Sequence, residues 1–193
     1  AGLQLDDEKL VTYWLNEARA RGSDGRWTRT AENLLMYANG DFDGLLKQAD
    51  YLLESLPGKS TLMAYRGIAQ MSLGLGVAAQ ETLQSGLDAG GYVNGKPLTG
   101  DQLTMAVQLA NAFDHNGKAA ERDDLVGDIN FVLEQILQEE TKIYELLFIK
   151  AGVASIQNNL PGVLHELQSA VEIGFRDHWE LLRNPVFKRW QEH

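Results

Sequence analysis

The segment 39–50 carries oxygen-bearing side chains at a spacing that could bind a metal ion. At its positions one, three, five, six and twelve stand Asn39, Asp41, Asp43, Gly44 and Asp50. Twelve-residue calcium loops use this spacing of oxygen ligands and turn glycine, although their last ligand is the longer Glu. The same residues also fit a turn between two helices, in which Asp41 and Asp43 cap the second helix. Both interpretations stay open, and the sequence favours helix capping over calcium.

Histidine and cysteine supply many catalytic bases, nucleophiles and transition-metal ligands. The chain has no cysteine, which excludes disulfides, thiolate zinc sites and cysteine nucleophiles. Its four histidines are His115, His165, His178 and His193. Glu166 follows His165, but no second histidine stands at the helical spacing of a zinc motif. We find no serine elbow and no phosphate loop, and we predict surface histidines, no cofactor and no enzymatic activity.

Acidic residues outnumber basic ones, and this balance bears on the partners of the chain. The 193 residues include 27 Asp and Glu against 17 Lys and Arg, for a formal net charge of -10. Adjacent acids such as Asp123-Asp124 and Glu139-Glu140 are typical of a solvated face rather than an acid–base pair. Because phosphate binding requires basic patches, nucleic acid and anionic membranes are excluded as default partners. No stretch approaches the roughly 20 apolar residues of a membrane-spanning helix, so we predict no membrane insertion.

The start of the chain bears on its origin. It begins at Ala1, without a methionine and without a secretory signal. We therefore expect a piece excised from a longer protein. The lack of cysteine suits both reducing and oxidising compartments, so a soluble protein of the cytoplasm or the periplasm is compatible with the sequence.

Hydrophobic residues recur at helical spacing along the whole chain. Residues 6–21, for example, place on one stripe Leu10, Tyr13, Trp14 and Leu15. Breaks such as Gly40, Gly74 and Gly117 separate this cluster and the later ones. The pattern predicts an all-α fold of about ten short helices with brief connections.

Residues 90–100 depart from the helical pattern. Asn94-Gly95 lies between two short extended runs, which is a strong local signal for a hairpin. Pro97 limits the second run to an edge strand or a loop. We expect an inserted loop or small hairpin here, and a longer helix connection is favoured over a binding loop.

The turn glycines recur at a fixed spacing. Gly40 and Gly74 lie 34 residues apart, and each closes one helix and opens the next. This pattern resembles the tetratricopeptide repeat (TPR) family, whose unit is a helical hairpin of 34 residues. With the turn glycine as position fifteen, units start at residues 26, 60, 103 and 144, and the insertion at 90–100 displaces the third.

Individual positions support the resemblance unevenly. Gly67 and Ala79 occupy positions at which the family uses small residues, so that paired helices approach closely. Arg66, Arg122 and Lys150 stand where the family prefers Leu or Ala. The resemblance covers residues 26–175 with clear turns and degenerate helices.

The resemblance implies one domain, a right-handed α–α superhelix. This TPR-like solenoid has about four helical hairpins over residues 26–175. Residues 1–25 are expected to form an N-terminal capping helix, and residues 176–193 a C-terminal cap. In that cap, apolar residues close the open end of the stack, namely Trp179, Leu182, Val186 and Phe187.

In this family the first helix of each pair lines a concave groove that receives an extended peptide or a partner helix. The inward-facing positions map onto Trp27, Leu34, Tyr37, Ile68, Met71, Val107, Asn111, Asp114, Glu145 and Phe148. The resemblance assigns Asn111 to holding the backbone of a ligand. Packing between helices is the simpler interpretation of each position.

The expected function is a non-catalytic protein–protein interaction module of a bacterial protein. A partly apolar, acid-rimmed groove selects a peptide or helix that carries apolar anchors and positive charge. Self-association through the ends of the array, giving a homo-oligomer, is a variant. The alternative is a regulatory or sensor domain of a bacterial transcriptional regulator or signalling enzyme.

Overall fold

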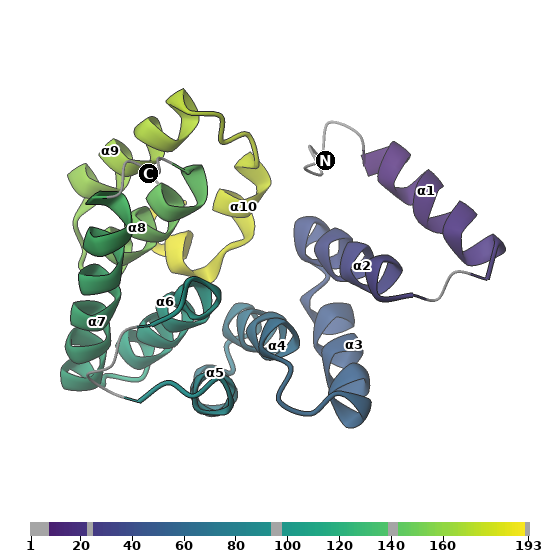
Figure 1. Cartoon of the computed structure of the whole chain (residues 1–193), viewed down its shortest axis with the longest axis horizontal. Coiled ribbons are helices and arrows are strands. Elements are labelled where there is room, and N and C mark those ends of the chain that lie inside the picture. Colours follow the sequence, from purple (N-terminus) through teal and green to yellow (C-terminus); the bar gives the residue numbers. More distant parts are fainter. Residues whose placement is uncertain (1–7, 23–24, 94–97, 139–142, 192–193) are drawn as a thin grey trace.

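The computed structural model describes residues 8–22, 25–93, 98–138 and 143–191. Within these ranges every regular element is a helix and no strand is present, which confirms the all-α prediction (Figure 1). In chain order the elements are α1 (Glu8–Ala20), α2 (Arg26–Asn39), α3 (Phe42–Ser55), α4 (Ser60–Ser72), α5 (Gly76–Ala89), α6 (Gly100–His115), α7 (Ala119–Gln138), α8 (Tyr144–Ile156), α9 (Leu160–Glu172), α10 (His178–Arg183) and the 3-10 helix η2 (Pro185–Trp190). None of these described helices combines the length and apolar character needed to span a membrane.

Four helix pairs, α2–α3, α4–α5, α6–α7 and α8–α9, share one kind of turn. Each is joined at a residue in the left-handed region of backbone space, with φ between 57° and 78°, namely Gly40, Gly74, Gly117 and Asn158. The N–H of the next residue donates to the carbonyl five residues earlier, over 2.8–2.9 Å, and so closes the first helix. Glycine and asparagine tolerate this backbone best. The predicted turns at Gly40, Gly74 and Gly117 are confirmed. The first helices begin at residues 26, 60, 100 and 144, so the third begins three residues before the predicted start at 103.

Small residues allow neighbouring helices to approach closely. A Cβ atom on Gly67 of α4 would lie 2.5 Å from Leu83 of α5, so glycine is required there. Gly86 of α5 likewise leaves room for the sulfur of Met105, a residue of α6. Ala79 is fully buried. The predicted close approach at Gly67 and Ala79 is therefore present, and it extends to the next pair.

Three charged residues at positions where the predicted repeat expects Leu or Ala pair with acids. Arg66 of α4 lies 2.7 Å from Asp50 of α3, and Lys150 of α8 lies 2.8 Å from Glu166 of α9. Arg122 of α7 contacts Asp114 of α6 at 2.6 Å. These ion pairs connect neighbouring helices at positions where the TPR-like pattern uses apolar contacts.

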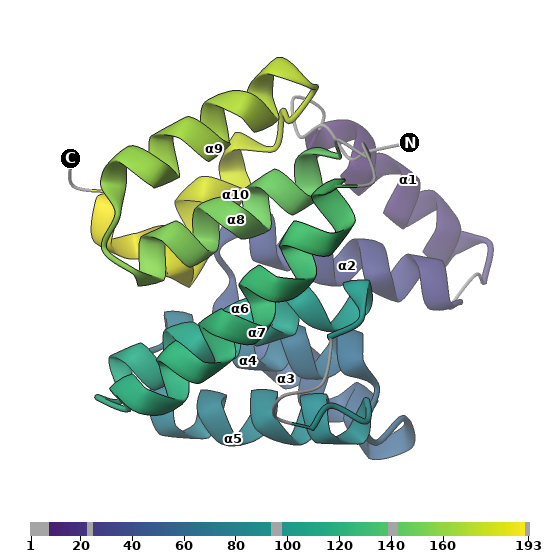
Figure 2. The same ribbon diagram turned by 60° about the vertical axis from the view of Figure 1, so that its left-hand side comes forward.

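Helix α6 is the centre of the hydrophobic core. It packs against α5 and α7 along its length and also against α4 and α8. Its fully buried residues include Leu103, Met105, Ala106, Leu109, Ala110 and Ala112. Figure 2 shows the pair α8–α9 side by side beyond α6 and α7.

The N-terminal helix α1 is a loosely attached element that packs against α2 (Figure 1). Leu15 is buried, but Tyr13 and Trp14 are 54% and 58% exposed. Only part of the predicted apolar stripe is therefore in the core. The side chain of Leu10 lies outside the described residues.

The C-terminal segment, α10 and η2, lies across the first helices of the pairs. Helix α10 packs against α2, and η2 packs against α4, α6 and α8. This position differs from the predicted cap over the end of the stack. Val186 and Phe187 are buried as predicted, whereas Leu182 is 59% exposed, so its assignment to the core is wrong.

The predicted hairpin at 90–100 falls largely on Asn94–Pro97, which lie outside the described residues. Gln102 of α6 forms hydrogen bonds to the residues on both sides of this segment. The amide nitrogen of Gln102 donates to the carbonyl of Gly90 at 3.0 Å, and its amide oxygen accepts from the N–H of Thr99 at 2.8 Å. One side chain thus holds both ends of the insertion together.

Candidate functional site

The predicted groove residues stand on the first helices of the pairs, and the C-terminal segment covers many of them. Leu34 and Tyr37 belong to α2, Ile68 and Met71 to α4, Val107, Asn111 and Asp114 to α6, and Glu145 and Phe148 to α8. The side chain of Trp27 lies outside the described residues. Five of the described ones are buried, namely Tyr37, Ile68, Met71, Val107 and Asn111. The packing interpretation therefore describes these five.

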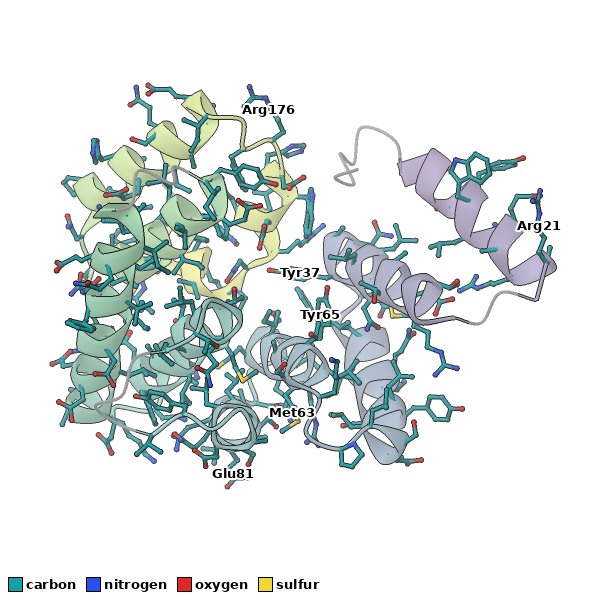
Figure 3. The ribbon with its side chains drawn as sticks, in the orientation of Figure 1. Arg21, Tyr37, Met63, Tyr65, Glu81 and Arg176 are labelled. Carbon is teal, nitrogen blue, oxygen red and sulfur yellow. The ribbon has the colours of Figure 1, made fainter. Side chains whose placement is uncertain are left out.

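Tyr37 illustrates how the segment covers this face. Its ring meets that of Trp179 edge-on at 5.4 Å between centroids, and it is 3% exposed. Tyr37 and Tyr65 both point from their helices toward the interior beside α10 (Figure 3). Neither the Tyr37 hydroxyl nor the Trp179 indole nitrogen has a hydrogen-bond partner among the described residues. Burial raises the pKa of Tyr65 to about 12, with a contribution from the Glu180 carboxylate.

Asp114 is an internal anchor. Its two carboxylate oxygens accept from Arg189 of η2 at 2.5 Å and from Arg122 of α7 at 2.6 Å. Burial alone raises the pKa of Asp114, but the hydrogen bonds from Arg189 and Arg122 outweigh it and hold the pKa below its ordinary value. Asp114 thus fixes the C-terminal segment to the α6–α7 pair.

A cavity of about 120 Å³ remains between α6, α8 and the C-terminal segment. Three predicted groove residues line it: Val107, Glu145 and Phe148. The other lining residues are Thr104, Gln108, Tyr144, Ile149, Gly152, Phe175, Glu180, Asn184, Val186 and Phe187. We take this cavity as the candidate binding site, because it combines apolar walls with a few convergent polar groups.

Gln108 is the most deeply buried polar group of the cavity, at 1% exposure. Its amide nitrogen donates to the Asn184 side-chain oxygen at 3.0 Å. Its amide oxygen has no hydrogen-bond partner among the described residues. An unpaired acceptor at this depth costs free energy, and a ligand that donates a hydrogen bond would recover it.

Glu180 brings a carboxyl group into the same cavity. Its pKa is raised to about 7, mainly by burial and also by the nearby carboxylates of Asp177 and Glu145. Aromatic rings surround it on the α8 side. Phe148 and Phe175 stack at 5.1 Å between centroids, and Tyr144 lies 5.9 Å from Phe175.

The sequence contained a signal for part of this site. Gln108 stands inside the apolar run of α6, between Val107 and Leu109, where a polar residue is unusual. Glu180 and Phe175 offer no such signal. Their place in the cavity depends on where the C-terminal segment lies against helices far away in the sequence.

The structure assigns the segment 39–50 to helix capping. Asp41 is the N-cap of α3 and accepts from the N–H of Gly44 at 2.9 Å. Asp43 follows in the first turn, and Asp50 is paired with Arg66. Among the described residues, no three His, Asp or Glu side chains come together as metal ligands do.

The histidines on the described part of the chain lie at the surface. His115, His165 and His178 are exposed, which confirms that prediction for three of the four. His193 lies outside the described residues.

A second cavity, between α5 and α7, is more open, and its carboxylates come from Asp88, Glu121 and Asp124.

Known proteins give no guide to these residues. None of the family models, curated proteins or solved structures compared with the chain matches it.

Proposed function

We propose that the chain is a non-catalytic interaction module of the TPR-like type, in which successive helix pairs form a right-handed superhelical solenoid. The observation that carries this proposal is the fourfold recurrence of one turn, at residues 40, 74, 117 and 158. Repeated helix pairs that contact their neighbours build an extended surface from their first helices, and such surfaces commonly bind protein segments.

The binding surface is the part of the first-helix face that the C-terminal segment leaves open. The cavity between α6, α8 and α10 lies on this face, and Thr104 and Glu145 are exposed beside it. The chain is acidic, with a formal net charge of -10. We therefore expect a partner peptide or helix that combines an apolar anchor with positive charge.

Affinity capture from native cell extract, with the full chain as bait, tests this function. The variant Thr104→Arg/Glu145→Arg adds bulk and positive charge at the cavity. The control Ser85→Arg/Glu81→Arg makes the same change of charge on α5, where both residues are exposed. We expect a partner that is lost with the first variant and kept with the second, because only the first alters the binding face.

Two results would contradict the proposal. A partner captured equally by both variants would place binding elsewhere on the surface. Capture of nothing by any bait would argue against an interaction module. Tyr37 and Asn111 are unsuitable for this test, because both are buried and their substitution would perturb packing.

A second candidate function is a regulatory or sensor domain. The observation in its favour is the cavity itself, which is formed jointly by the repeat helices and the C-terminal segment. A small ligand there would contact both parts and so could shift the position of α10. Limited proteolysis near Leu182, with and without ligand, distinguishes this candidate from a passive adaptor. A sensor domain should show a ligand-dependent change in cleavage of the C-terminal segment.

A further inference from the structure

We propose that the cavity between α6, α8 and α10 binds a primary ammonium group on a short apolar stem, as a lysine side chain presents it. This inference deepens the proposed function, and it rests on that function where a partner protein supplies the lysine. A free organic amine carries the same chemistry, and the experiments below separate the two sources.

The charges around the cavity favour a cation. Glu145 and Glu180 line it, and Asp177 lies near enough to act electrostatically on Glu180. None of the described residues that line the cavity is Lys or Arg. An anionic ligand would therefore meet carboxylates without a compensating charge, whereas an ammonium group would relieve their mutual repulsion.

The unpaired polar atom of the cavity is an acceptor. The amide oxygen of Gln108 lacks a partner, while the amide nitrogen is already used by Asn184. Because this oxygen is enclosed by protein atoms, a ligand that reaches it must bring a donor. An ammonium group has three donors and no acceptor, so it can satisfy Gln108 and a carboxylate together.

The walls and the size of the cavity fit a slender apolar stem. The rings of Tyr144, Phe148 and Phe175 lie along one side, and aromatic rings attract cations as well as alkyl groups. A cavity of about 150 Å³ holds benzene. The volume of about 120 Å³ therefore suits a group of a few heavy atoms, such as the end of a lysine.

Titration with n-butylamine is the direct test. At about pH 8 this amine is protonated, since ordinary alkyl ammonium groups have a pKa near 10.4. The full chain is labelled with nitrogen-15 and followed by NMR, with n-butanol as an uncharged probe of similar length. We expect saturable shifts at Thr104, Phe148 and Phe175, and binding of the amine about tenfold tighter than that of the alcohol.

Two results of this titration would overturn the proposal. Equal binding of amine and alcohol would show that the cavity selects shape rather than charge. The absence of shifts at the lining residues would show that it holds water only.

Two variants and a control test the residues. Glu180→Gln removes the charge and keeps the shape of the side chain, and we expect it to weaken amine binding about tenfold. Glu81→Gln, on the exposed side of α5 (Figure 3), should leave binding unchanged. Should Glu180→Gln fail to fold, Glu145→Gln removes the exposed carboxylate of the same cavity. Unchanged amine affinity in the variants that fold would overturn the proposal.

A peptide distinguishes the two sources of the ammonium group. A blocked Gly-Lys-Gly peptide should compete with n-butylamine, and its form acetylated on the lysine nitrogen should not. If the amine binds and the peptide does not, the lysine of a partner is excluded and the site is one for free amines. If a partner is captured equally by the native chain and by Glu180→Gln, the proposed lysine anchor is wrong, but the proposed interaction function still holds.

Discussion

The two ends of the chain are both short helical segments with exposed aromatic or aliphatic residues, yet the fold holds them differently. At the N-terminus, α1 contacts α2 and leaves Trp14 more than half exposed. At the C-terminus, η2 contacts three of the first helices and buries Val186 and Phe187 almost completely. The contrast is between an element that rests on the array and one that is part of its core.

Polar anchors explain much of this difference. Ser155 of α8 donates its hydroxyl to the carbonyl of Val186 at 2.6 Å and accepts from the Trp190 indole nitrogen at 2.8 Å. Asp114 adds its ion pair with Arg189. These bonds fix the position of η2 in a way that apolar contact alone does not, because hydrogen bonds are directional and burial is not.

The largest expected effect comes from removing one aromatic ring at each end. Phe187→Ala should lower the free energy of unfolding by about 3–5 kcal/mol, because the ring is buried against Phe148 and leaves a cavity. Trp14→Ala should change it by no more than about 0.5 kcal/mol, because the ring is largely exposed. Urea unfolding of both variants measures the difference. Similar losses would mean that the two ends are held alike.

A smaller effect tests the polar anchors. Ser155→Ala leaves the Val186 carbonyl and the Trp190 N–H without their buried partner, and should cost about 1–3 kcal/mol. Ser72→Ala is the control, since its hydroxyl bonds only to the Ile68 carbonyl of its own helix. Urea unfolding is again the measurement. Equal stability of the two variants would show that packing alone positions η2.

The turns could be predicted from the sequence because their cause is local. A residue with positive φ is needed where one helix stops and the next begins, and glycine meets that need best. Gly40, Gly74 and Gly117 therefore predict the turns, and the turns define which helices form pairs. At Asp41 the sequence leaves helix capping and calcium binding open. The hydrogen bond from the Gly44 N–H to the Asp41 carboxylate assigns this residue to capping.

The candidate site could not be predicted in the same way, because contacts between distant residues form it. The hydrogen bond from Gln108 to Asn184 joins residues 76 positions apart. A helical pattern reports which face of a segment is apolar, but not which other segment covers that face. For this reason the helical pattern predicts the helices that carry Tyr37 and Val107, but not that α10 and η2 pack against those helices.

A change of pH offers a way to loosen the C-terminal end without substitution. The carboxylates that raise the pKa of Glu180 are those of Asp177 beside it and Glu145 of α8. Three tyrosines also face it, and Glu180 in turn raises their pKa values, namely Tyr37 of α2, Tyr65 of α4 and Tyr144 of α8. The Glu180 pKa of about 7 in the folded chain lies above the ordinary value near 4.3. Between these two pKa values the folded state keeps the Glu180 proton, whereas the unfolded state has released it. The free energy of unfolding therefore falls as the pH rises toward about 7.

The measurement is the unfolding free energy at about pH 5 and about pH 8. Relative to Glu180→Gln, the native chain should lose on the order of 1–2 kcal/mol between these values, because the variant has no proton to release. Glu81→Gln serves as the control and should follow the native chain. A constant difference between the native chain and Glu180→Gln would refute the assignment.

The smallest expected effect concerns two ion pairs that link separate helices, Arg19–Glu32 near the N-terminus and Arg189–Asp114 near the C-terminus. Arg19 reaches Glu32 at 2.7 Å, but the arginine is 57% exposed, so a double-mutant cycle should give a coupling of about 0–1 kcal/mol. The cycle of Arg189→Gln with Asp114→Asn should give a larger coupling, since both side chains are mostly buried. Added salt should weaken the first coupling more than the second. If the two couplings were equal, the polar anchors would not distinguish the ends, and the burial of Val186 and Phe187 would have to account for the whole difference.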